Sequence, residues 1–164
     1  MPLPDAEALC AELVKKLRPA VRPETAMVGI HTGGAWLAER LHRELGLTVP
    51  LGRLDISFYR DDYHTSGLHK SVKASKIPFE VDGRHILLVD DVLYTGRTVR
   101  AAMNELFDYG RPETIALVVL VDRGERQLPI CPQYCGATHA VPKGAMLRLH
   151  RDEREKLTLR LDDE

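Results

Sequence analysis

One stretch of the sequence, Ile86–Thr98, limits the choice of fold more than any other part of the chain. Four apolar residues of strong β-propensity lead into the adjacent carboxylates Asp90 and Asp91, and a turn with two threonines, a glycine and an arginine follows. A helical pattern begins behind the turn, so the stretch predicts a strand, a loop and a helix N-terminus. In an open parallel sheet, an anion is favoured beyond the carboxyl ends of the strands. The stretch therefore predicts a site for phosphate and ribose.

Three segments have the apolar spacing that is typical of amphipathic helices. The first follows Asp5, a suitable N-cap, and is expected to end before Pro19. The second runs from Ala35 to about Leu45, and the third follows the central stretch and ends near Gly110. Because these helices alternate with apolar runs, they are expected to pack on a sheet.

Further strands are expected on both sides of the central stretch. Ala26–Ile30 and Ile115–Val121 are nearly continuous apolar runs, which is typical of strands that are covered on both faces. Leu54–Phe58 alternates between apolar and polar residues, which predicts a half-buried strand. Near the C-terminus, Met146–Leu149 and Leu157–Leu161 flank a charged turn and predict a hairpin. We therefore predict a single α/β domain over residues 1–164, with a mainly parallel sheet.

The composition excludes several classes of protein. The net charge is −1 and charges of both signs are interspersed, which argues against a large electrostatic surface for nucleic acid. The three cysteines, Cys10, Cys131 and Cys135, are odd in number and lack the usual zinc spacing, so reduced thiols are expected. The N-terminus lacks the features of a signal peptide, and no stretch approaches the roughly 20 apolar residues of a membrane span. The expectation is a cytoplasmic protein with no membrane partner.

Two other segments are expected to lie near the carboxyl end of the sheet. His31–Gly34 follows a predicted strand and precedes a helix, so it forms a second unit of strand, glycine loop and helix. From Tyr59 to about Lys76 the apolar period disappears. Loops of this length in a compact domain are usually functional lids or disordered.

The residue types of the central stretch indicate its ligand. Carboxylates such as Asp90 and Asp91 suit vicinal hydroxyls and a hydrated Mg²⁺, whereas Thr95–Thr98 suits a phosphate dianion. Acidic pairs also occur as helix caps or turn formers, but the hydroxyls, the glycine and the cation at the helix start favour a ligand. Together these residues predict a sugar phosphate that is held at two points.

This pattern resembles the phosphoribosyl pyrophosphate signature of type I phosphoribosyltransferases, and it lacks the spacing of a Walker P-loop or a Rossmann fingerprint. Four segments further resemble the PyrR-type pyrimidine operon regulators: Leu54–Asp62, Val89–Ala102, Leu120–Gly124 and Leu128–Ile130. The resemblance spans about residues 28–130. It implies the type I phosphoribosyltransferase fold, an α/β fold with helices flanking the sheet, a flexible active-site loop, and a small hood or terminal hairpin.

The resemblance implies a uracil phosphoribosyltransferase that forms uridine monophosphate (UMP) and pyrophosphate from uracil and phosphoribosyl pyrophosphate, with Mg²⁺. The implied catalytic residues are Asp90, Asp91 and Arg60, and the two aspartates would hold the ribose hydroxyls and the metal, through water. The implied substrate-binding residues are Val92, Leu93, Tyr94, Thr95, Gly96, Arg97, Thr98, His31, Thr32, Gly33, Gly34, Asp61, Asp62, Asp122 and Arg123. Among them, Thr95–Thr98 (the phosphate loop) would cradle the 5′-phosphate. His31–Gly34 (the glycine loop) and the lid that begins at Tyr59 would bind pyrophosphate, and the backbone around Asp122 and Arg123 would contact the base.

The sequence departs from the family pattern at two of these positions. Gly33 stands where the family commonly has an arginine, which bears on pyrophosphate binding. Tyr94 stands where many related transferases carry an aspartate, so no general base is assigned. Uracil has an acidic N–H that can lose its proton without one.

Other functions stay open at this point. A regulator that binds RNA in response to uridine nucleotides and attenuates transcription would need a basic face. The stretch Asp122–Lys143 supplies Arg123, Arg126 and Lys143, but also Glu125, and it has Cys131 where the family often has a further arginine. A sensor of phosphoribosyl pyrophosphate or nucleotide with little turnover is a third reading. Purine and orotate transferases share the central signature but lack the context of Leu120–Gly124. A homodimer or higher homo-oligomer is expected from the resemblance.

Overall fold

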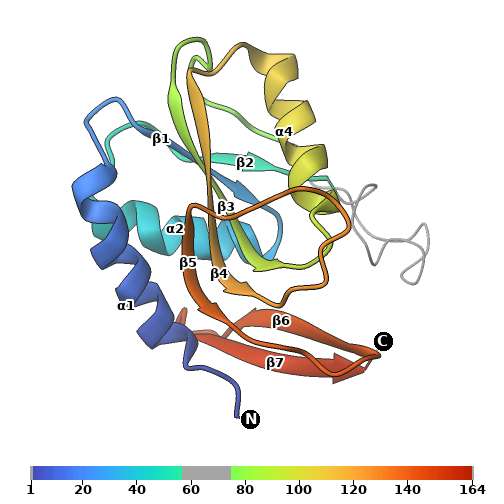
Figure 1. Ribbon diagram of the computed structural model, residues 1–164. Coiled ribbons are helices and arrows are strands. Elements are labelled where there is room, and N and C mark those ends of the chain that lie inside the picture. The colour runs from blue at the N-terminus through green and yellow to red at the C-terminus, as the bar shows by residue number, and fades with distance from the viewer. Residues whose placement is uncertain (1, 57–74, 164) are drawn as a thin grey trace.

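A computed structural model describes residues 2–56 and 75–163 (Figure 1). Its centre is a five-stranded sheet in the order β2-β1-β3-β4-β5, and every neighbouring pair of strands is parallel. The strands are β1 (Ala26–Ile30), β2 (Gly52–Leu54), β3 (His85–Leu93), β4 (Thr114–Asp122) and β5 (Tyr134–Thr138). The predicted α/β fold with a parallel sheet is confirmed.

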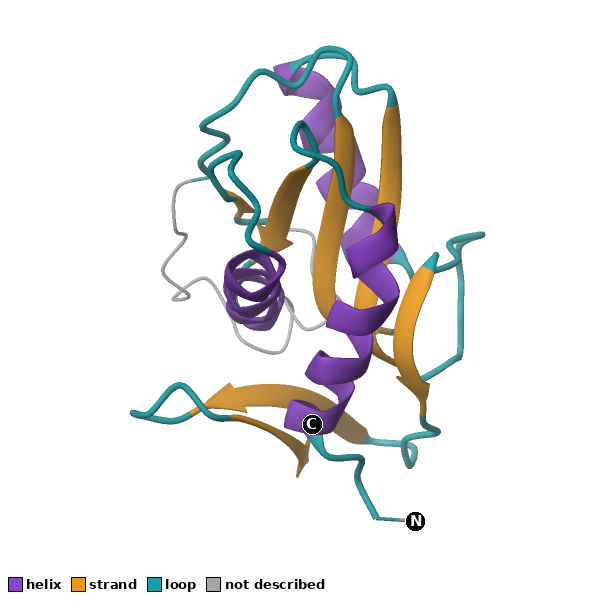
Figure 2. Ribbon diagram, turned by 90° about the vertical axis from the view of Figure 1, so that its left-hand side faces the viewer, coloured by secondary structure: helices purple, strands orange, loops and turns teal. Residues whose placement is uncertain are grey.

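Helices cover both faces of this sheet (Figures 1 and 2). The helices α1 (Ala6–Leu17) and α2 (Gly33–Leu45) lie on one face, a short 3-10 turn (Arg18–Ala20) follows α1, and α4 (Arg97–Tyr109) lies on the other face. Asp5 caps α1 as expected, because its Oδ1 accepts a hydrogen bond from the Glu7 N–H at 3.0 Å. Within residues 2–56 and 75–163, no helix is long and apolar enough to cross a bilayer.

Alternate side chains of the central strands build two separate hydrophobic clusters. In β3, Leu87 and Val89 pack into the cluster under α1 and α2, whereas Ile86 and Leu88 pack into the cluster under α4. All four are buried. Burial on both faces explains why the strand is a continuous apolar run, and it fixes the position of the residues that follow.

The predicted hairpin at the C-terminus is confirmed. β6 (Ala145–Arg151) pairs antiparallel with β7 (Leu157–Asp163), with Leu149 opposite Leu159. Figure 1 shows the hairpin beyond the carboxyl ends of β3 and β4, and the inward-facing leucines join the cluster under α1 and α2. The hairpin therefore closes the end of the sheet where a ligand is expected.

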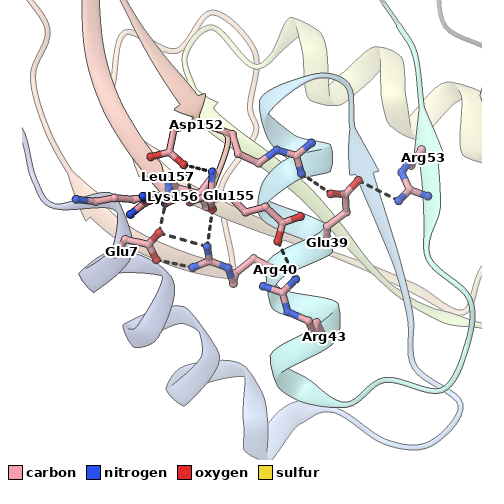
Figure 3. Close-up of polar contacts among 11 residues, drawn as sticks. Glu7, Glu39, Arg40, Arg43, Arg53, Asp152, Glu155, Lys156 and Leu157 are labelled. Atoms are coloured by element: carbon pink, nitrogen blue, oxygen red, sulfur yellow. Dashed lines mark hydrogen bonds and ion pairs between the residues drawn. The ribbon is translucent and has the colours of Figure 1, made fainter.

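A first set of ion pairs ties this hairpin to α1 (Figure 3). Glu7 forms a side-chain ion pair with Arg40 of α2, and it also accepts the Leu157 N–H at 2.9 Å. Arg40 in turn donates to the carbonyl of Glu155 at 2.8 Å. The hydrogen bond from Arg40 lowers the pKa of Glu7 and raises that of Arg40. One salt-bridged pair therefore fixes α1, α2 and the hairpin together.

A second set of ion pairs ties α2 to the hairpin and to β2 (Figure 3). Glu39 of α2 accepts from Arg53 at 3.0 Å and from Arg151 at 2.6 Å. Burial alone raises the pKa of Glu39, but the two arginines outweigh it and leave that pKa lowered. The guanidinium of Arg151 also lies 5.2 Å from the ring centroid of Trp36. These contacts hold α2 in a fixed position on the sheet.

The observed elements differ from the predicted ones in three places. β2 spans Gly52–Leu54, whereas a strand was expected over Leu54–Phe58; the Asp55 N–H donates to Ser75 Oγ at 2.9 Å, and Ser57 and Phe58 lie outside the described residues. α2 begins at Gly33, two residues before the expected start. β5 was not predicted, since it is short and half-exposed and has Gly136 where a side chain would meet the Leu120 carbonyl oxygen and α1.

Candidate active site

The order of the strands places a topological switch point between β1 and β3. The sheet runs outward from this pair in both directions, and the helices that follow the two strands, α2 and α4, lie on opposite faces. Ligands of open α/β sheets bind at such a switch point, beyond the carboxyl ends of the strands. The two loops that the sequence singled out, His31–Gly34 and Tyr94–Thr98, leave these same two strands. The fold therefore brings them to one place.

The acidic pair lies inside β3. The sequence had suggested that the strand ends where the pair begins. The strand continues to Leu93, with Asp90 opposite Val119 and Val92 opposite Val121 of β4. Asp90 is 2% exposed and Asp91 8% exposed, and the Asp91 N–H donates to Asp90 Oδ1 at 2.9 Å. Because the strand ladder holds their backbone, the two carboxylates are fixed before any ligand arrives.

The glycine loop packs directly against this pair. The peptide bond between His31 and Thr32 is cis, and α2 starts at the next residue. A Cβ atom placed on Gly33 would overlap Asp91 Oδ2, and one placed on Gly34 would lie 2.7 Å from the Val89 carbonyl oxygen. Both glycines are therefore required for the close approach of α2 to β3.

Hydrogen bonds within the phosphate loop and from the segment after β4 hold the loop in place. The Thr95 carbonyl accepts the N–H groups of Gln127 at 2.9 Å and Leu128 at 3.1 Å, while Thr95 Oγ1 accepts the Arg97 N–H at 3.2 Å. Gly96 has φ +94°, and a Cβ atom there would lie 2.9 Å from Ile130. Thr95 is buried, and the positive φ together with the close approach to Ile130 requires glycine at position 96.

The N-terminus of α4 has the features of an anion site. Its N-cap is Gly96, which offers no side-chain hydrogen bond, and the first turn contains no acidic residue. The first N–H groups of a helix lack intrahelical partners, and the helix dipole adds positive potential there. Arg97 at the helix start donates to Gln127 Oε1 at 2.9 Å and remains exposed. The geometry suits a phosphate group of a ligand.

Arg126, which the sequence indicated only as a candidate RNA contact, holds the loop after β4 together. It donates to both carboxylate oxygens of Asp122, at 2.9 and 2.7 Å, and to the carbonyls of Tyr94 and Ile130, each at 2.9 Å. The hydrogen bond from Arg126 lowers the pKa of Asp122, which also accepts the Gly124 N–H at 2.9 Å. The side chain of Asp122 is thus engaged within the protein. The sequence signal for this ion pair was an aspartate and an arginine four residues apart in a polar segment.

Arg123 connects the phosphate loop to the terminal hairpin. Its guanidinium carbon lies 3.8 Å from the ring centroid of Tyr94, and its Nη1 donates to the Ala145 carbonyl at 3.2 Å. Arg123 is 6% exposed, Nη2 donates to Glu125 at 3.3 Å, and Nε has no partner among the described residues. The side chain of Arg123 therefore packs between the phosphate loop and the hairpin, and its N–H donates to the Leu93 carbonyl at 3.0 Å.

Three of the predicted site residues, Arg60, Asp61 and Asp62, lie outside the described residues, as does most of the predicted lid. In the part of the chain that is described, no group of three or more candidate metal ligands occurs. Two carboxylates, Asp90 and Asp91, are sufficient for Mg²⁺, because this ion keeps several waters and is typically bound by one or two carboxylates together with substrate phosphates.

Comparison with known proteins identifies the family. The model of the phosphoribosyl transferase domain matches residues 2–135. A protein of Pseudomonas aeruginosa named "Bifunctional protein PyrR" is 52% identical over 163 residues, covering 96% of this chain and 90% of the relative. The chain belongs to the phosphoribosyltransferase family. Within that family, a PyrR protein of Pseudomonas putida is also 49% identical over 162 residues.

Solved structures of the family have the same fold. A hypoxanthine-guanine phosphoribosyltransferase from Bacillus anthracis superposes with a TM-score of 0.67 at 20% identity, covering 85% of this chain and 83% of that one. A purine phosphoribosyltransferase from Pyrococcus horikoshii has a TM-score of 0.61 at 25% identity and covers 82% of each chain. The predicted type I phosphoribosyltransferase fold is thus confirmed, together with the resemblance to PyrR.

Proposed function

We propose that this phosphoribosyltransferase transfers the phosphoribosyl group of phosphoribosyl pyrophosphate to uracil, which gives UMP and releases pyrophosphate. One observation carries the proposal: the buried acidic pair and the N-terminus of α4, whose N-cap Gly96 has no side chain to fill it, lie on consecutive parts of one β-loop-α unit, at the switch point of the sheet. That arrangement suits a ligand with vicinal hydroxyls and a phosphate. The high identity to PyrR proteins and the segment Leu120–Gly124 favour uracil over a purine.

In this proposal, each part of the site has a distinct task. Asp90 and Asp91 accept hydrogen bonds from the ribose 2′- and 3′-hydroxyls, and the loop Tyr94–Thr98 donates backbone N–H groups to the 5′-phosphate. The backbone of Val92 and Leu93 supports that loop. The segment that begins at Asp122 is assigned to the base, as the resemblance implies. The side chains of Asp122 and Arg123 are engaged within the protein, and so are the N–H groups of Arg123 and Gly124, which donate to the Leu93 carbonyl and to Asp122 Oδ1.

The transition state explains why the site has this charge pattern. As the bond from the ribose C1 to pyrophosphate breaks, positive charge develops on the ribose and negative charge on the leaving group. The fixed carboxylates lie on the ribose side, and the loop His31–Gly34 offers its backbone to pyrophosphate. Mg²⁺ bound with Asp90 and Asp91, through water, would neutralise the leaving group. Water exclusion is the task we assign to the predicted lid, which contains Arg60.

The enzymatic proposal is tested by mixing the protein with Mg²⁺, phosphoribosyl pyrophosphate and one base at a time. We expect UMP from uracil, and little or no nucleotide from hypoxanthine, guanine or orotate, as measured by separation of the nucleotides. A chelator of Mg²⁺ is expected to stop the reaction. Binding of phosphoribosyl pyrophosphate without any nucleotide product would instead favour the sensor, and a purine nucleotide would overturn the choice of base.

A second candidate function, binding of RNA from a pyrimidine-gene leader, is favoured by the identity to proteins named bifunctional. Of the three cations in Asp122–Lys143, Arg123 and Arg126 are engaged in the fold, and Lys143 is exposed. We therefore expect weak binding in a filter assay, with or without UMP. Tight binding that weakens steeply with salt would establish the regulatory function. Assembly into a homodimer or higher homo-oligomer stays a prediction.

A further inference from the structure

We propose that the outer edge of β7 is an interface at which two copies of this chain pair antiparallel, with Leu161 of one copy opposite Leu161 of the other about a twofold axis. The two terminal hairpins then form one four-stranded sheet. This inference does not depend on the proposed function, because it rests on the backbone and the charges of the hairpin alone.

β7 forms the outer edge of the terminal hairpin. Figure 1 shows β6 on the side of the central sheet and β7 beyond it, and α1 reaches only the start of β7, where Glu7 accepts the Leu157 N–H at 2.9 Å. An antiparallel strand directs the N–H and C=O groups of alternate residues to the same side. Because Leu157 donates away from β6, the backbone groups of Leu159, Leu161 and Asp163 also face away from β6.

This row of backbone groups has no second strand beside it in the part of the chain that the structure describes. The hairpin is a sheet of two strands, and no described segment outside it is hydrogen-bonded to the backbone of Leu159, Leu161 or Asp163. An edge of this kind can pair with a strand of another chain.

Leu161 lies on the apolar face of the hairpin but outside the core. It is directly opposite Leu147, which is 4% exposed and packs into the cluster under α1 and α2, whereas Leu161 itself is 42% exposed. One exposed leucine needs no explanation by itself. Here it lies in the middle of the unpaired edge, so a partner strand covers the leucine and the backbone groups together.

The charges on the other face of the hairpin match a second copy of the same strand. Arg160 is exposed, lies directly opposite Arg148 and has no ion pair with a described residue. Like charges in this position oppose pairing of the strands. With Leu161 on the twofold axis, Arg160 of each copy lies opposite Asp162 of the other. The interface therefore contains two symmetric ion pairs.

The neighbouring registers lack this match. An axis at Arg160 or at Asp162 would place like charges directly opposite one another. An axis at Leu159 would require the Leu157 N–H, which Glu7 already accepts. Charged residues on an edge strand commonly prevent pairing. In β7 the alternating signs disfavour the shifted registers and favour the one that is centred on Leu161.

The interface is short, so the association is expected to be weak. Only about five residues of each strand pair, which places the buried area below that of a standard interface. We expect a dissociation constant on the order of 10 to 100 µM. Sedimentation equilibrium between about 1 and 500 µM measures it as a doubling of the mass with concentration, whether the smaller species is a single chain or an assembly formed through another surface.

The test is reversal of the two charges, one at a time and then in a mixture. Arg160→Asp and Asp162→Arg each place like charges opposite one another across the axis, so each variant alone should associate at least about tenfold more weakly than the wild type. An equimolar mixture restores both ion pairs, because a copy with two aspartates meets a copy with two arginines. The mixture is therefore expected to associate as the wild type does.

Arg154→Asp is the matched control, because Arg154 is exposed in the turn of the hairpin and lies outside β7. It makes the same change of charge and should associate as the wild type does. Leu161→Glu places two carboxylates on the axis and should abolish the association without lowering the melting temperature, since the side chain is already 42% exposed.

Several results would overturn the proposal. These are a wild type that shows no doubling of the mass up to 500 µM, on the order of ten times the weakest expected dissociation constant, and single variants that associate as tightly as the wild type. A mixture of the two variants that stays dissociated would also overturn it, as would an equal loss of association in Arg154→Asp. None of these results bears on UMP formation, so the proposed function is tested separately.

Discussion

The double variant Asp90→Asn/Asp91→Asn is expected to form UMP at least about a thousandfold more slowly than the wild type, which is the loss seen when a principal electrostatic group of an active site is removed. The amides have nearly the same shape as the carboxylates, but they carry no charge to oppose the positive ribose. Steady-state rates with uracil and phosphoribosyl pyrophosphate measure the effect.

The same variant is expected to remain folded, with a melting temperature equal to or above that of the wild type. Asp90 and Asp91 are both buried, and an ionised carboxylate loses more hydration on burial than a neutral amide of the same shape. An asparagine at position 90 can still accept the N–H of residue 91 through its side-chain oxygen. Loss of activity with retained stability would separate a catalytic role from a structural one.

Asp108→Asn is the control for this experiment. Asp108 is exposed on the last turn of α4, far along the helix from the phosphate loop, and we expect no change in rate. Equal rates for Asp90→Asn/Asp91→Asn and the wild type would refute the assignment of ribose and metal to the pair. A comparable loss in Asp108→Asn would mean that the assay reports charge or folding in general.

Two short sequence patterns predicted that the two loops of the candidate site lie at one edge of the sheet. Continuous apolar runs locate β1 and β3, and each is followed by a glycine-containing turn and a helix. The rule for parallel sheets then places both turns at one edge. These inferences need only local periodicity and strand direction, so the structure confirms them.

The sequence could not predict contacts that depend on how separate loops meet. The hydrogen bond from Arg126 to the Tyr94 carbonyl joins residues that are 32 positions apart, and no local pattern in either segment predicts it. The close approach of Gly33 to the Asp91 side chain likewise depends on the distance between α2 and β3, which the sequence does not give. β5 was missed for another reason, because its half-exposed residues have no clear apolar period.

Replacing Arg126 by methionine is expected to destabilise the protein by about 3 kcal/mol and to raise KM for phosphoribosyl pyrophosphate by about tenfold or more. The variant leaves the Asp122 carboxylate, with a side chain 14% exposed, without its cation. It also leaves the carbonyls of Tyr94 and Ile130 without their donor, so the phosphate loop loses a support on the side away from the ligand. Denaturant unfolding and substrate kinetics measure the two effects.

The pH dependence of the Arg126 effect has a definite sign. The pKa of Asp122 is lowered in the folded protein, chiefly by its hydrogen bond with Arg126, so the pair stabilises the fold above the ordinary value of 3.8. This contribution is lost as the pH falls through the lower value of the folded state. The difference in stability between wild type and Arg126→Met should therefore shrink below about pH 3.8.

Two further variants separate the charge of Arg126 from its donated hydrogen bonds. Adding Asp122→Asn to Arg126→Met should restore part of the stability, since no unpaired carboxylate remains, but KM should stay high because the two carbonyls still lack a donor. Arg43→Met is the control, because its ion pair with Glu155 is about 60% exposed and contributes little. Recovery of KM together with stability would mean that Arg126 acts only by neutralising Asp122, and that the phosphate loop keeps its conformation without it.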